Sequence, residues 1–152
     1  MTRAALAGAL LFLLAPAARA QDVPVAVEFR FVVDCAAADA SPPIKDVRRG
    51  ESYCLSRHIL LDEDDIDRAE PTTAGTGDPA IRLRFTDRGA KRLLQATASK
   101  VGERLGMVVN SRLLAAPVIR GPLGQEIVMI GLGSPEEAAA IARALNQKIP
   151  PD

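Results

Sequence analysis

The sequence predicts an α+β fold, in which a layer of helices packs on one face of an antiparallel sheet. Two observations predict it. Residues 81–150 alternate as strand, helix, two strands, strand and helix, and residues 25–33 add an early strand rich in β-branched residues and Phe. Segments in this order form a layered sandwich when the apolar faces of the helices cover one side of the sheet.

The first 20 residues have the pattern of a secretory signal peptide. Arg3 precedes a stretch of mostly Ala and Leu. Residues 18–20 (Ala-Arg-Ala) then give the small-x-small pattern that a signal peptidase needs for cleavage, here before Gln21. The apolar stretch is shorter than the about 20 residues of a membrane span, so an uncleaved anchor is the less favoured alternative. We therefore expect a chain that is soluble after cleavage, in the periplasm or another exported compartment.

Length and composition exclude several classes of protein. The 152 residues become 132 after removal of residues 1–20, enough for one compact domain or two small lobes. The formal net charge of zero becomes −2 once Arg3 and Arg19 are removed, and the aromatic residues are four Phe and one Tyr. Such a chain lacks the basic surface of a nucleic-acid-binding protein, and no apolar stretch beyond residue 20 is long enough to span a membrane.

The two cysteines, Cys35 and Cys54, are expected to form a disulfide. An even pair in an exported protein favours a structural bridge, which would close a loop of about 20 residues and stabilise it by roughly 3 kcal/mol. A redox pair and half of a metal site are the alternatives. Both fit less well, because the CxxC spacing is absent and His58 is the only histidine.

Residues 21–70 predict a small strand-rich lobe. Its strand-like segments lie at residues 25–33, 52–55 and 59–61. Residues 61–69 predict a short helix, because Asp62 can cap it and the acids that follow suit the positive end of the helix dipole. Residues 71–79 contain two Gly and two Pro, which predicts a linker between two lobes.

Residues 80–150 begin with a strand and a helix. Ile81, Leu83 and Phe85 alternate with arginines, as in a half-buried strand. Thr86 can cap the helix that follows, and Gly106 can end it. The expected buried stripe of this helix consists of Ala90, Leu93, Leu94, Thr97, Val101 and Leu105.

Three further strands and a second helix complete this segment. The strands are expected at residues 107–109, 113–119 with a break at Pro117, and 127–130. Asn110-Ser111 can form the tight turn between the first two. Ser134 can cap the last helix, with Pro135 at its first position and Glu137 three residues after the cap.

The same segment resembles the head of the first periplasmic domain of SecD, a membrane subunit of protein export. The resemblance rests on three motifs in order: Thr86-Asp87-Arg88-Gly89-Ala90, Ala115-Ala116-Pro117-Val118-Ile119 and Ser134-Pro135-Glu136-Glu137-Ala138. It implies a ferredoxin-like head over residues 80–150 and a partial base lobe over residues 21–70. The chain departs from the family at Asn110-Ser111, where Asp-Gly is usual, and carries no counterpart of the membrane helices of SecD. The resemblance therefore implies passive binding, without proton-driven movement.

No catalytic, cofactor or metal site is predicted. His58 stands alone and fits a surface or structural role better than a catalytic triad. The acidic run at residues 62–67 departs from the EF-hand pattern, which needs Gly at its sixth position and Glu at its twelfth. Gly131-Leu132-Gly133 resembles a phosphate-binding loop only weakly, and a tight turn between strand and helix explains it better. We therefore expect a protein that is not an enzyme.

Four arginines form the candidate partner-binding surface: Arg82, Arg84, Arg112 and Arg120. Arg82 and Arg84 share the outward face of one strand. A solvated face, in which these arginines pair with Glu103 or Glu126, is the simpler interpretation, and a surface for acidic or extended peptides is the functional one. Edge strands nearby could also pair with an added peptide strand.

Three hypotheses of function follow. The favoured one is an accessory role in protein export or envelope protein handling, through contact with unfolded polypeptide or with the export machinery. The alternative is a stand-alone domain that binds and regulates an unrelated envelope partner. Binding of a small molecule or a metal is the third.

Overall fold

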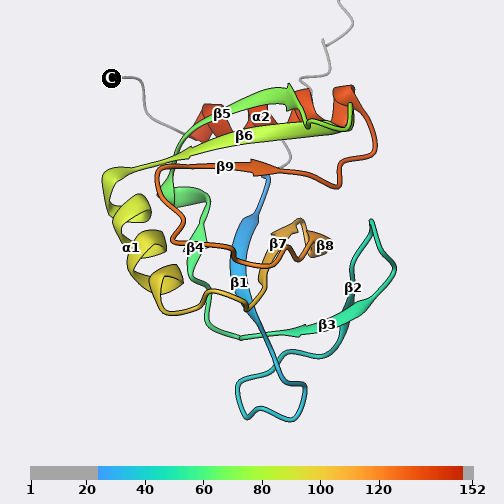
Figure 1. The fold of residues 1–152 in the computed structure, drawn as a ribbon. Coiled ribbons are helices and arrows are strands. Elements are labelled where there is room, and N and C mark those ends of the chain that lie inside the picture. The colour runs from blue at the N-terminus through green and yellow to red at the C-terminus, as the bar shows by residue number, and fades with distance from the viewer. Residues whose placement is uncertain (1–23, 149–152) are drawn as a thin grey trace, which may run out of the picture.

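The computed structural model describes residues 24–148, so the predicted signal peptide and its cleavage site lie outside the described chain (Figure 1). This part of the chain is mostly strands, with two α-helices and one short 3-10 helix. The elements are β1 (Val27–Val33), β2 (Ile44–Lys45), β3 (Ser52–Leu55), β4 (Leu61–Asp62), η1 (Glu63–Asp65), β5 (Ile66–Thr73), β6 (Pro79–Phe85), α1 (Asp87–Ala98), β7 (Leu105–Val109), β8 (Arg112–Ala115), β9 (Glu126–Met129) and α2 (Pro135–Lys148).

The strands form two antiparallel sheets. One has the order β2-β3-β1-β7-β8, with β4 also paired to β1, and the other has the order β5-β6-β9. The mixed α/β prediction is confirmed. The single ferredoxin-like sheet expected for residues 80–150 is not formed in the described structure, because β7 and β8 pair with β1 whereas β6 and β9 pair with β5.

Burial explains this division. All five residues of β7 are buried, so this strand needs cover on both faces, and it pairs with β1 along five residues from Val27 to Phe31. Side chains of β6 instead alternate between buried and exposed, with Leu83 buried between the exposed Arg82 and Arg84. This alternation is typical of a strand with one face toward solvent. Helix α2 packs on the buried face of β5 and β6, and α1 lies beside η1, β4 and β6 (Figure 1).

The helix predicted at residues 61–69 is wrong. These residues form β4, the single turn η1 and the first half of β5. Asp62 does cap a turn, accepting a hydrogen bond from the backbone of Asp64 at 3.0 Å. The helix stops there because Ile66 and Ala69 are buried as part of a strand that pairs with β6, with a register shift between Ile66 and Arg68.

The linker predicted at residues 71–79 is a β-hairpin. Residues 71–73 end β5, Pro79 begins β6, and the turn between them is closed by a hydrogen bond from the Gly77 amide to the carbonyl of Ala74. Gly77 has φ +87°, a value that suits glycine. The glycines and prolines of this segment therefore serve a turn within one sheet.

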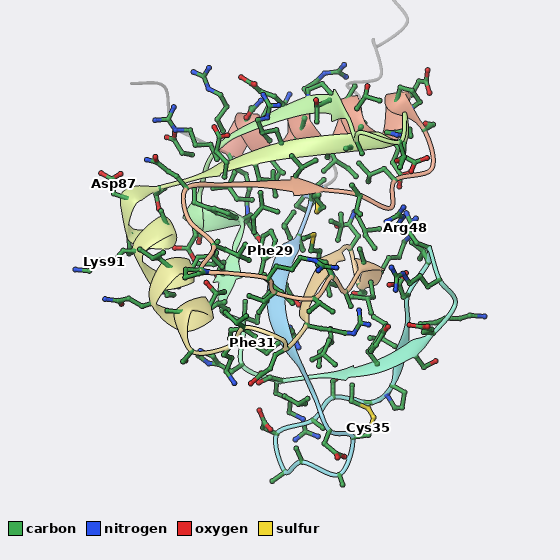
Figure 2. All side chains as sticks on the ribbon, viewed as in Figure 1. Phe29, Phe31, Cys35, Arg48, Asp87 and Lys91 are labelled. Atoms are coloured by element: carbon green, nitrogen blue, oxygen red, sulfur yellow. A yellow bond between two sulfur atoms is a disulfide. The ribbon has the colours of Figure 1, made fainter. Side chains whose placement is uncertain are left out.

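The larger of two hydrophobic clusters contains residues from both predicted lobes, residues 21–70 and 80–150. Phe29 of β1 and Phe85 of β6 pack edge to face, with ring centroids 5.5 Å apart, and Phe29 lies in the middle of the molecule (Figure 2). A smaller cluster of Leu55, Val108 and Leu113 lies on the opposite face of β1 and β7. This second cluster exists because side chains alternate between the two faces of each strand.

Several local predictions are confirmed. Thr86 accepts a hydrogen bond from the Gly89 amide, and Ser134 accepts one from the Glu137 amide. Asn110 and Ser111 both have positive φ, 48° and 63°, as a tight hairpin turn requires. The predicted stripe of α1 is too long. The helix ends at Ala98, Leu105 belongs to β7, and Leu94 and Val101 are exposed.

Candidate functional site

The predicted disulfide between Cys35 and Cys54 is present. Cys54 is buried in β3, and Cys35 lies in the exposed loop after β1, at the end of the molecule far from α2 (Figure 2). The bridge closes a segment that contains β2 and Asp46. The buried Asp46 carboxylate accepts hydrogen bonds from the amides of Arg48 and Arg49, at 2.7 and 3.1 Å, so this segment is fixed by local bonds as well as by the disulfide.

The four candidate arginines come from three different segments of the structure. Arg82 and Arg84 lie on the outer face of β6, as predicted. Arg112, on β8, forms an ion pair with Glu137 of α2 at 2.8 Å. Helix α2 packs on the buried face of β5 and β6, opposite the face that carries Arg82 and Arg84. Arg120 is exposed in the connection between β8 and β9.

The outer face of β6 carries balanced charge. Arg84 lies 3.6 Å from Asp67, and Arg82 is the cross-strand partner of Glu70 in β5. Glu126 lies opposite Arg84 in β9, whereas the Glu103 carboxylate instead pairs with Lys100 at 2.9 Å. Alternating charges of this kind suit a solvated face, so these arginines alone do not mark a binding site.

The free edge of β9 is a stronger candidate. β9 is the last strand of its sheet, and the Phe85 amide donates to the carbonyl of Gln125 at 2.9 Å. Antiparallel pairing alternates, so this bond directs the backbone N–H and C=O groups of Glu126 and Val128 away from β6. No other strand of the described structure pairs with this edge, which leaves it able to accept an added strand.

An apolar groove of about 260 Å³ runs beside this edge. It is lined mainly by Leu105, Met107, Val118, Leu123, Ile127 and Val128. Val118 and Val128 are 38% and 41% exposed, so they offer apolar surface to a partner. We define these residues and the edge of β9 as the β9 groove. Sequence reasoning predicted that an edge strand could accept a peptide but did not locate this groove. A run such as Pro117-Val118-Ile119 shows local strand tendency but not which strand lies opposite it.

The remaining polar clusters have structural roles. Within residues 24–148 no group of three or more His, Cys, Asp or Glu residues is arranged to hold a metal ion. The buried Asp65 carboxylate lies 3.2 Å from Arg88 and 3.1 Å from Arg92. The one buried acid of the run at residues 62–67 is therefore paired with arginines. His58 is exposed on a loop.

Glycines between β9 and α2 form a tight turn. Gly131 has φ +97°, and a Cβ there would lie 2.3 Å from the carbonyl oxygen of Leu114, so only glycine fits. The Gly133 amide donates to the Glu137 carboxylate at 2.6 Å. This bond and then Arg112 lower the pKa of Glu137. The Gly133 amide, which a phosphate-binding loop would offer to its ligand, is therefore already bonded to a carboxylate of the protein itself.

The described chain is a small mixed α/β domain with the β9 groove at the edge of one sheet. Neither helix of the described chain is long and apolar enough to span a bilayer. Residues 40–148 match the family model described as SecDF, P1 head subdomain. The chain belongs to this family.

The most similar proteins include subunits of the protein translocase. Over 71 residues the chain is 42% identical to protein translocase subunit SecDF of Thermus thermophilus, a match that covers 46% of this chain and 10% of that protein. Over 100 residues it is 32% identical to protein translocase subunit SecD of Rhodobacter capsulatus, with coverage of 65% and 18%. The matched region thus spans less than a fifth of either relative.

Solved structures of SecDF have the same fold. One, described as a membrane component SecDF that enhances protein export, superposes with a TM-score of 0.64 at 28% identity and covers 80% of this chain and 62% of that chain. SecDF in a super-membrane-facing form gives a TM-score of 0.63, again at 28% identity, with coverage of 80% and 18%. The predicted resemblance to the SecD head is therefore confirmed.

Proposed function

We propose that the protein is an exported accessory module that contacts extended polypeptide during protein export, with the β9 groove as its binding surface. Membership of the SecDF P1 head family supports a role in protein translocation. The observation that carries the polypeptide contact is the unpaired edge of β9 beside an apolar groove.

Binding would use backbone and side-chain contacts together. An extended peptide can pair with the outward N–H and C=O groups of Glu126 and Val128, which requires no particular sequence. Alternate side chains of such a strand point to one face, where Val118 and the groove floor can cover apolar groups. An unfolded exported chain supplies both features, because its backbone and apolar residues are not yet buried.

We further propose that the protein acts in the periplasm as a soluble domain without catalytic activity, next to the export machinery. The family of translocase subunits supports this location. Crosslinking in intact cells tests it. Translocon subunits or nascent exported chains would be recovered under this proposal, whereas recovery of one unrelated enzyme would favour a regulator of another envelope partner.

A substitution that removes one outward amide tests the groove. Val128→Pro deletes an N–H that points away from β6, and edge strands tolerate proline at such positions. We expect this variant to bind a reduced, carboxymethylated unfolded protein about tenfold more weakly, measured by fluorescence anisotropy, since pairing along the edge is interrupted.

Val128→Thr is the matched control, because it keeps the amide and the β-branched shape. We expect it to bind within about twofold of the unmodified protein, since the backbone pairing is intact. Equal binding by the proline variant, with its melting temperature unchanged, would remove the β9 edge from the mechanism.

A further inference from the structure

A second pocket lies on the face of β7 opposite the β9 groove. Met107 lines the groove, whereas its neighbour Val108 lines this pocket, which has a volume of about 400 Å³. Glu28 and Arg30 of β1 form its polar side. Its apolar side consists of Ile44, Leu55 and Val108. We name these five residues the Arg30 pocket. Its size is in the range of small-ligand sites.

Arg30 carries a buried side-chain donor without a hydrogen-bond partner in the described structure. Its Nη2 lies 2.7 Å from Oε2 of Glu28, and its buried Nε has no hydrogen-bond partner in the described structure. A guanidinium carries five N–H donors. Leaving a buried donor without an acceptor is unfavourable, and most buried donors in proteins have one. This Nε has no contact with solvent, so an acceptor that enters the pocket can satisfy it only when the Arg30 side chain turns.

Charge restricts which acceptor fits. Glu28 already places a carboxylate against Arg30, and both side chains are only partly exposed, at 27% and 21%. A second anion would be repelled by Glu28 at short range. A neutral carbonyl avoids this repulsion, and an N–H group beside it can donate to Glu28.

We propose that the Arg30 pocket binds a neutral amide that carries an apolar side chain. The amide oxygen accepts from the Arg30 guanidinium, whose side chain turns toward the ligand, and the amide N–H donates to Glu28. The apolar group packs on the surface formed by Ile44, Leu55 and Val108. A convergent polar pair above an apolar floor is typical of small-ligand sites.

The disulfide supports one wall of this pocket. Ser41, Pro42 and Ile44 line it and belong to the segment closed by Cys35 and Cys54. The Ser41 hydroxyl accepts a hydrogen bond from the Leu55 amide at 3.1 Å, which holds this wall against β3. The pocket does not depend on the β9 groove, since the two lie on opposite faces of β7.

Titration of the oxidised full-length protein with N-acetyl-L-leucinamide tests the proposal. We expect a Kd on the order of 1 mM, as suits a ligand of so few atoms. In ¹⁵N-resolved spectra the Arg30 Nε–H signal and the amides of Val108 and Ser111 should shift together along one saturation curve. No variant is needed for this measurement.

Two comparisons make the test decisive. N-acetyl-L-leucinate, which differs by a carboxylate in place of the terminal amide, should bind at least fivefold more weakly. Arg30→Lys removes the Nε donor and the planar fork, and should weaken N-acetyl-L-leucinamide at least fivefold, whereas Val128→Pro should leave it unchanged. Equal binding of the two ligands, equal binding by Arg30→Lys, or no shift of the Arg30 Nε–H signal would each overturn the proposal.

Discussion

Helices α2 and α1 are attached to the sheets through different chemistry. Helix α2 buries an apolar stripe on β5 and β6, consisting of Ala138, Ile141, Ala142 and Leu145. Helix α1 buries Leu93 as its one large apolar side chain, and its Arg88 and Arg92 reach the buried carboxylate of Asp65. An apolar stripe is encoded within the helix, whereas the ion cluster depends on a residue outside it. The two helices should therefore respond differently to substitution.

The largest expected effect concerns α2. Leu145 is 2% exposed, and Leu145→Ala should lower the free energy of unfolding by about 3 kcal/mol, because it removes buried apolar contacts and leaves a cavity. Urea denaturation measures this change. Leu94→Ala, at an exposed position of α1, is the control and should change stability by less than about 0.5 kcal/mol. Similar losses in both variants would contradict the comparison.

A smaller loss is expected at the base of α1. Asp65→Ala should lower the free energy of unfolding by about 2 kcal/mol, less than for a fully buried ion pair, because Arg88 and Arg92 are 67% and 45% exposed and can be rehydrated. Amide hydrogen exchange should show lost protection in α1 while α2 keeps its protection. The exposed neighbour Asp64 provides the control Asp64→Ala, and a uniform loss across both helices would contradict local attachment.

The smallest effect concerns acid pH at the start of α2. The Gly133 amide and Arg112 lower the pKa of Glu137. The stabilisation is complete above the unfolded pKa of about 4.3 and is lost as pH falls through the lower folded pKa. Glu137→Gln should cost less than about 1 kcal/mol at pH 7.

Melting temperatures between pH 3 and pH 7 measure this dependence. The difference between the unmodified protein and Glu137→Gln should shrink toward acid pH, because both then carry an uncharged side chain at this position. A difference that is constant across the range would show that the charge of Glu137 does not contribute.

The contrast between features encoded within one element and features that depend on distant residues also explains what could be predicted from sequence. Thr86, Ser134 and Asn110-Ser111 act within a few residues, so their caps and turn were predictable. The strand alternation around Leu83 is also local. The β9 groove and the division into two sheets were not, because they depend on β1 and β7 pairing across the chain.

The errors at residues 61–79 have a physical cause. The acids near Asp62 favour a helix start, and one turn of helix does form. Pairing with β6 along Ile66–Thr73 then outweighs local preference. The ion pair of Arg112 with Glu137 was not predictable for a related reason, since only the fold brings β8 beside the start of α2.

The position of β1 has a consequence for the order in which the domain is assembled. β1 lies between β3 and β7, and its residue Val27 pairs with Val109, which lies 82 residues further along the chain. A chain made from its N-terminus presents β1 long before β7, and closing so long a loop is slow. The central strand pair therefore cannot form until β7 is present, so β1 stays without this partner while the segments between them are added.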